Sequence, residues 1–126
     1  MKSVISALVI FILIVTMIVI GYVYTNNVTE EMLQSLYKNE NYISKNNWQM
    51  AHNEVENMDN IWYGNRNIMV ILFNHNVIEK VDLSIAKTKK TIQMQKKEDF
   101  FYESKNLELL LKSLVEQQEI SIGNVF

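Results

Sequence analysis

The sequence predicts an all-α protein in which one N-terminal transmembrane helix precedes a small antiparallel bundle of about four helices. Three observations lead to this fold class. A long uncharged apolar run lies near the N-terminus, and apolar residues recur at alternating steps of three and four through the rest of the chain. The 126 residues include no proline and only three glycines, fewer turn residues than β-sandwiches and barrels need. We expect residues 1–25 to form the anchor and residues 26–126 the bundle.

The apolar run begins at Val4, ends at Tyr24 and contains no charged side chain. As a helix, a run of this length measures about 32 Å, which matches a hydrocarbon core of about 30 Å. Tyr22 and Tyr24 stand where aromatic rings favour the headgroup layer. A cleaved signal peptide is the alternative, but its apolar core is shorter, and the best cleavage match, at Gly21, is poor. We therefore expect an uncleaved signal anchor.

The charges that flank this run predict its orientation. Lys2 and the α-amino group precede it, whereas the first charges after it are Glu30 and Glu31. Positive charge is retained on the cytoplasmic side. We expect a single-pass protein of the cell membrane, with its N-terminus in the cytoplasm and residues 26–126 outside.

Composition argues against several classes of function. The chain has 12 basic and 14 acidic side chains, a net charge of −2, whereas nucleic-acid-binding proteins normally carry a basic surplus. The absence of cysteine removes disulfides, thiolate catalysis and cysteine-ligated metals. No Ser-His-Asp arrangement and no glycine-rich phosphate loop is recognisable. We expect a protein that is not an enzyme, has no cofactor and binds no nucleic acid.

Residues 26–126 are predicted to form four amphipathic helices joined by short turns. Asn27, Asn46 and Asn76 each stand three residues before Glu or Gln, a pattern typical of helix N-caps. The first of these helices should end between Asn41 and Lys45, Gly64 is a candidate kink, and residues 120–126 should form a short tail broken at Gly123. The stripes predicted to face the core are Val28, Met32, Leu33, Leu36 and Tyr37; Trp48, Ala51, Val55, Met58, Trp62, Asn65, Met69 and Leu72; Ile78, Val81, Ile85, Thr88, Ile92 and Gln95; and Phe100, Phe101, Ser104, Leu107, Leu110, Leu111, Leu114 and Val115.

Two groups of residues are the candidates for metal binding. His52 and Glu56 share one helix face, and His75, Glu79 and Asp82 share another. Two such groups on antiparallel helices could ligate one metal ion. The chain lacks the Glu-x-x-His pattern of di-iron bundles, and each residue also has a simpler interpretation as a turn, cap or solvated side chain. No metal site is therefore expected, and these five residues remain the candidates.

The aromatic residues have two interpretations. Trp48 and Trp62 are two heptads apart and so lie on one helix face, which is usually a core face. A buried Trp62 needs a partner for its indole N–H, and Asn65 is the nearest candidate. Alternatively, Trp48, Trp62, Phe100 and Phe101 form a surface for another protein. Adjacent Phe100 and Phe101 supply one ring more than a single stripe needs.

Lysines cluster in the second half of the chain. Lys87, Lys89, Lys90, Lys96 and Lys97 precede Glu98 and Asp99. We interpret this cluster as a solvated face, with binding to anionic lipid headgroups or wall polymers as the alternative.

Several segments together resemble a known family. They are the apolar span, Trp62, Asn46-Asn47-Trp48-Gln49-Met50-Ala51, Leu72-Phe73-Asn74-His75-Asn76-Val77-Ile78, Val81-Asp82-Leu83-Ser84-Ile85-Ala86 and Ile120-Ser121-Ile122-Gly123-Asn124-Val125-Phe126. The pattern resembles the family called domain of unknown function 4363 over nearly the whole chain. The resemblance implies a small membrane-anchored helical protein of low-GC Gram-positive bacteria, often encoded beside another small membrane-protein family. It implies no activity, substrate or cofactor.

These observations favour a single-pass membrane protein that presents an extracytoplasmic helical module. We expect a non-enzymatic accessory or interaction subunit, held in the membrane by residues 4–24, whose partner is another membrane protein or a second copy of the chain. The alternative is an extracytoplasmic bundle that binds a ligand or metal in the manner of a sensor.

Overall fold

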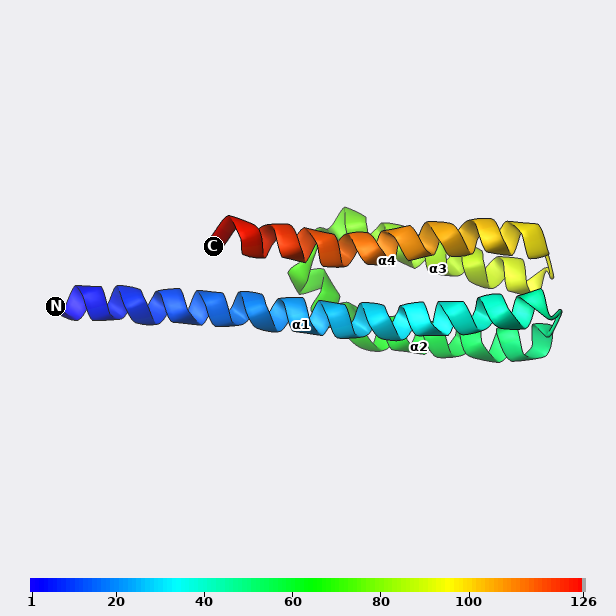
Figure 1. Ribbon diagram of the computed structural model, residues 1–126, viewed down its shortest axis with the longest axis horizontal. Helices are drawn as coiled ribbons and strands as arrows, with labels where there is room; N and C mark the ends of the chain where they lie inside the picture. The colour runs from blue at the N-terminus through cyan, green and yellow to red at the C-terminus, as the bar shows by residue number, and fades with distance from the viewer. Residues whose placement is uncertain (126) are drawn as a thin grey trace.

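The computed structural model describes residues 1–125, without the side chains of Ser121 and Val125 (Figure 1). It contains four helices, α1 (Lys2–Ser44), α2 (Trp48–Leu72), α3 (His75–Gln93) and α4 (Lys97–Val125), and no strand within the described residues. The prediction of an all-α helical bundle is confirmed.

The four helices pack in a ring. α1 contacts α2 and α4, and α3 contacts the same two neighbours, whereas the diagonal pairs do not pack together in the described part of the chain. Successive helices are antiparallel, as short connections require, so both chain termini and the α2–α3 turn lie toward one end (Figure 1). α1 is much longer than its neighbours, and its N-terminal part extends alone beyond them.

The core follows the predicted stripes. The side chains of Met32, Leu36, Met58 and Trp62 have no exposed surface, and buried residues recur at steps of three and four along each helix. Among the predicted core positions, Tyr37 and Phe101 are exceptions with 43% and 38% exposure, and Gln95 is also exposed. The fully or nearly fully buried apolar side chains of the other stripes include Ala51, Val55, Met69, Ile78, Val81, Ile85, Ile92, Phe100, Leu107, Leu111 and Leu114.

α1 is a single helix across the expected boundary between anchor and bundle. We predicted a new helix capped at Asn27, and this prediction is wrong, because α1 runs without interruption from Lys2 to Ser44. The apolar run ends in phase with the buried positions Thr25, Val28 and Met32, so the helix has no reason to stop. Asn27 is exposed on its outer surface.

The α1–α2 and α3–α4 turns have the same construction. Asn46, two residues after the end of α1, has φ 57°, and Gln95, two residues after the end of α3, has φ 54°. The next residue in each turn donates its N–H to a carbonyl five residues back, Asn47 to Tyr42 at 2.8 Å and Lys96 to Thr91 at 3.0 Å. This is the bonding of a Schellman motif, which satisfies the last carbonyls of a helix.

Helix starts and ends differ from the predicted ones by a few residues. The N-caps are Asn47 and Asn74 rather than Asn46 and Asn76, because Asn46 adopts the left-handed conformation and Asn76 already lies in the first turn of α3. The predicted tail is also wrong: α4 continues through Gly123 to Val125, while Phe126 lies outside the described residues. α2 passes through Gly64 as one helix.

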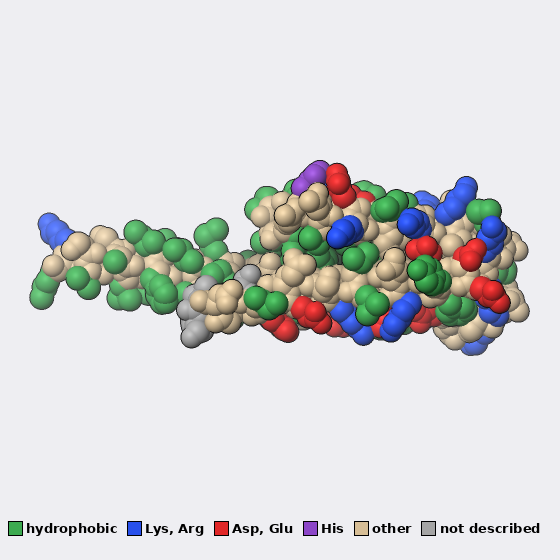
Figure 2. Space-filling model, turned by 90° about the horizontal axis from the view of Figure 1, so that it is seen from above, with side chains coloured by type: hydrophobic (Ala, Val, Ile, Leu, Met, Phe, Trp, Pro, Cys, Tyr) green, Lys and Arg blue, Asp and Glu red, His purple; other side chains and the backbone are tan. Residues whose placement is uncertain are grey.

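The N-terminal part of α1 exposes apolar side chains on all sides. Leu8 is 57% exposed and Met17 is 73% exposed, and Figure 2 shows this segment projecting from the bundle covered with apolar side chains. Among the described residues, α1 is the one helix long and apolar enough to cross a membrane.

Candidate interaction surface

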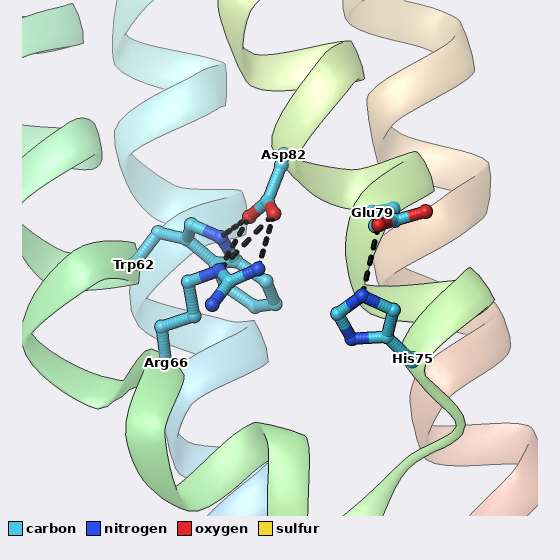
Figure 3. A network of polar contacts seen from close by, with 5 residues as sticks. All are labelled: Trp62, Arg66, His75, Glu79 and Asp82. Atoms are coloured by element: carbon cyan, nitrogen blue, oxygen red, sulfur yellow. Dashed lines mark hydrogen bonds and ion pairs between the residues drawn. The ribbon is translucent and has the colours of Figure 1, made fainter.

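A polar cluster joins α2 to α3 and centres on Asp82 (Figure 3). Trp62 donates its indole N–H to Asp82 Oδ1 at 2.7 Å. Arg66 donates from Nε to the same oxygen at 3.0 Å and from Nη2 to Oδ2 at 2.7 Å. The guanidinium therefore binds the carboxylate in the two-pronged geometry that arginine favours. This cluster satisfies the polar edge of a buried tryptophan and fixes the register of α3 on α2.

The carboxylate of Asp82 is held in its charged form. Burial raises the pKa of Asp82, but hydrogen bonds from Arg66 and Trp62 lower it by more, and the pKa lies below its ordinary value. The hydrogen bond that Arg66 donates to Asp82 likewise raises the pKa of Arg66. The carboxylate is engaged by the tryptophan and the arginine that it holds in place, so we interpret the cluster as a structural link between α2 and α3.

Sequence reasoning predicted the wrong partner for Trp62. Asn65, the expected partner, instead accepts a hydrogen bond from the Tyr24 hydroxyl and donates to the Ile61 carbonyl. Arg66 was not singled out at all. The sequence did contain an indication, because Arg66 is the only Lys or Arg between Lys45 and Lys80. A single cation beside an apolar stripe needs a partner.

The candidate metal ligands are dispersed. His75 pairs with Glu79 at 2.9 Å near the start of α3, and both side chains are largely exposed. His52 lies in the second turn of α2, and about 30 Å of helix separates it from the end of α2, where His75 follows. Within the described residues, no group of three or more His, Cys, Asp or Glu side chains is placed to hold a metal ion. The structure does not bring the two predicted groups together.

Glu56, the remaining candidate ligand, has a cationic partner. Lys89 of α3 lies 2.8 Å from Glu56 Oε1 and 3.5 Å from Asp59 Oδ2 of α2. The hydrogen bond that Lys89 donates to Glu56 lowers the pKa of Glu56 and raises the pKa of Lys89. This pair is a second link between α2 and α3, on the bundle surface.

The four aromatic candidates divide into core and surface residues. Trp62 and Phe100 have no exposed surface, so their predicted role on an interaction surface is wrong, because each lies at a core position of its helix. Trp48 is half-buried and packs on the edge of the core. Phe101 is 38% exposed and meets Phe100 edge to face, with ring centres 5.2 Å apart.

The outer face of α3 carries a mixed stripe that we call the α3 stripe: Lys80, Leu83, Lys87, Lys90 and Met94. Its members recur at steps of three and four, which places them on one side of the helix. Leu83 is 56% exposed and Met94 is 50% exposed. In α3, which the structure describes completely, none of these three lysines forms an ion pair. These three lysines are therefore cations of α3 without an ionic partner, whereas the acidic Glu79 of α3 is paired only with titratable His75.

Shallow grooves follow the α3 stripe along its border with α4. One is lined by Lys80, Leu83, Ser84, Lys87, Asn106 and Leu110. A second continues toward the α3–α4 turn and is lined by Lys87, Lys90, Thr91, Met94, Lys96, Asp99, Tyr102 and Glu103. Figure 2 looks down on this side of the molecule and shows Lys and Arg side chains among apolar ones along the bundle. Sequence reasoning identified Lys87 and Lys90 of the stripe but missed Lys80 and the apolar residues Leu83 and Met94.

The fold and this surface define an all-α protein with one apolar N-terminal helix and a four-helix module. The family model described as "Domain of unknown function (DUF4363)" matches residues 19–125, and the chain belongs to this family. This confirms the resemblance inferred from the sequence. No curated protein and no solved structure matches the chain.

Proposed function

We propose that this chain is a single-pass membrane protein whose helical bundle acts as a non-enzymatic docking module for another membrane protein. α1 supplies the anchor, through the uncharged run from Val4 to Tyr24. Lys2 before this run and Glu30 and Glu31 after it favour a cytoplasmic N-terminus and an extracytoplasmic bundle.

The α3 stripe is the observation that carries the proposal. It presents Leu83 and Met94 beside Lys80, Lys87 and Lys90, which have no ionic partners within α3 or its described neighbours. Exposed apolar side chains rimmed by charge are typical of surfaces that bind proteins. The positive sign of the rim favours a partner segment that carries apolar and acidic side chains, because complementary charge guides association and suppresses wrong partners.

Site-specific photocrosslinking in native membranes tests this function. A benzophenone amino acid replaces Leu83 in the α3 stripe, and the matched control replaces Asn60, which is exposed on α2. We expect position 83 to yield one defined adduct with a membrane protein and position 60 to yield none. Equal adduct patterns at both positions would contradict a docking role for α3.

Charge reversal identifies the chemistry of the contact. Lys87→Glu combined with Lys90→Glu should abolish most of the adduct at position 83, because it places like charges opposite the acidic partner. The control, Lys38→Glu on α1 combined with Lys45→Glu in the turn that follows it, makes the same change in net charge and should leave the adduct unchanged. An adduct with the mass of two copies of this chain would instead identify a homo-oligomer and overturn the proposal of a different partner.

A further inference from the structure

Three charge-free segments meet at the end of the bundle from which the apolar part of α1 emerges. α1 has no charged residue between Lys2 and Glu30, the chain has none between Arg66 and Glu79 other than titratable His75, and residues 120–125 have no charged side chain. The topology places all three at the same end, because α2 ends, α3 begins and α4 ends there (Figure 1). We call the second and third of these segments, residues 67–78 and 120–125, the basal end.

The opposite end of the bundle has the reverse character. Its two turns and their flanks contain Lys45, Lys96, Lys97, Glu98 and Asp99. A bundle surrounded by water on all sides has no physical reason to keep two segments at one end free of charge while it gathers charge at the other. A bundle that meets a second, less polar solvent at one end has such a reason, because charge transfer out of water is costly.

Apolar side chains at the basal end are left uncovered by protein. Ile71 is 81% exposed, Ile120 is 64% exposed and Ile68 is 46% exposed. An open hollow between α1 and α2 is lined by Met17, Ile20, Gly21, Tyr24, Ile68 and Leu72. These lining residues belong in part to the apolar run itself, so the exposed surface of α2 is continuous with the proposed membrane span.

One contact gives the position of the basal end along the proposed membrane span of α1. A Cβ atom built on Gly21 would lie 3.2 Å from Leu72 Cδ2, so the last turn of α2 is level with Gly21. The helical rise from Val4 to Gly21 is about 26 Å, less than the roughly 30 Å thickness of a hydrocarbon core. A bilayer that begins at Val4 therefore ends within one helical turn beyond Gly21, so the last turn of α2 lies at the boundary between the apolar layer and the headgroups.

Polar groups near the basal end match the adjoining headgroup layer. Tyr22 donates a hydrogen bond to Glu119 at 3.3 Å, and Asn74 caps α3 through the N–H of Asn76. Tyrosine is enriched at this level of a membrane. We propose that the basal end is seated at the membrane boundary, with Ile71 and Ile120 in contact with lipid and the α2–α3 turn at the level of the headgroups. The inference rests on the proposed anchoring of α1.

Single cysteines carrying a nitroxide spin label test the inference without background, because the chain contains no cysteine. Ile71→Cys reports the basal end, Met17→Cys reports the span and Tyr102→Cys reports the aqueous surface of the bundle. All three side chains are more than 70% exposed, so substitution leaves the core intact. The full-length protein is reconstituted into vesicles of phosphatidylcholine and phosphatidylglycerol, and label accessibility to oxygen and to a water-soluble nickel chelate is measured.

We expect the label at Ile71 to be several-fold less accessible to nickel than the label at Tyr102 and to be relaxed by oxygen, as at Met17. If Ile71 is as accessible to nickel as Tyr102 while Met17 is lipid-exposed, the seated basal end is wrong and the anchor stands. If the label at Met17 is also aqueous, the anchor itself is wrong. A label at Ile71 that is shielded from both reagents would show that protein, not lipid, covers this end.

Discussion

The two halves of α1 use apolar side chains in different ways. In the N-terminal half, apolar residues surround the helix and lie exposed, as at Leu8 and Met17. In the C-terminal half, apolar residues are confined to one stripe, with Met32 and Leu36 fully buried against α2 and α4. A helix that is apolar all round needs an apolar solvent, whereas a striped helix finds its apolar environment within the protein. The two patterns of α1 therefore suit two different environments, although the backbone has no break.

The largest expected effect comes from comparing the same substitution, Met to Ala, in the two halves of α1. Met32→Ala should destabilise the bundle by about 2–5 kcal/mol, because it removes a fully buried side chain and leaves a cavity. Met17→Ala, in the exposed half of the same helix, should change stability by less than about 0.5 kcal/mol. Urea unfolding in mild detergent, followed through the fluorescence of buried Trp62, measures both. Equal effects would show that the two halves are not distinct environments.

The second prediction concerns the Asp82 cluster, which has no counterpart in the apolar N-terminal half of α1. Asp82→Asn should cost about 1–3 kcal/mol, because it weakens the bonds to Trp62 and Arg66. The pKa of Asp82 is lowered in the folded state, so its stabilisation is present above the unfolded value of about 4 and is lost as pH falls through the folded value. Unfolding midpoints between pH 6 and 3 should therefore decline more for the wild type than for Asp82→Asn. Parallel curves would contradict this role.

A third prediction sharpens the comparison within the striped half. Asn39 is fully buried in α1, and neither atom of its amide has a hydrogen-bond partner among the described residues. Asn39→Leu keeps the shape of the side chain and removes the cost of burying the amide. We expect a gain on the order of 1 kcal/mol in the free energy of unfolding. A loss of stability would indicate that the amide is satisfied and specifies the helix register.

The smallest expected effect compares two glycines. A Cβ at Gly64 of α2 meets nothing within 4 Å, so Gly64→Ala should stabilise the bundle by up to about 1 kcal/mol through helix propensity. At Gly21, where the apolar run meets the bundle, the same change places a Cβ 3.2 Å from Leu72, so the gain should be smaller or reversed. Thermal unfolding of the two variants measures the difference. An equal gain at both sites would show that α1 and α2 are loosely packed at Gly21.

Helix faces could be predicted from the sequence because they depend on local spacing. The stripes through Trp48–Leu72 and through residues 78–92 were identified with their buried members, since burial repeats every three or four residues whatever the partner. The residues at which helices begin and end were less predictable. The pattern Asn27-x-x-Glu30 is also ordinary surface polarity within a helix, and only the uninterrupted packing of α1 distinguishes a cap from an exposed asparagine.

The contacts between helices and the exposed surface of α3 could not be predicted from the sequence, because they depend on how the helices pack against one another. Asp82 reaches Trp62 from a different helix, and the pairing depends on the register of α3 against α2, which spacing within one helix does not encode. For the same reason, the sequence could not decide which of Phe100 and Phe101 is buried. The α3 stripe was visible as lysines alone, because an exposed leucine between them is recognised as exposed only when the core face of α3 is known.

The unbroken course of α1 has a mechanical consequence. A helix of this kind is a stiff rod, so the bundle cannot swivel independently of the segment beneath it, and any tilt or rotation of one is imposed on the other. An α-helix turns about 100° per residue. Inserting a single residue near Gly21 would therefore rotate the bundle, and with it the lysines of α3, around the axis of α1 relative to the N-terminal segment. The direction in which this protein faces its neighbours is therefore set by the phase of one helix.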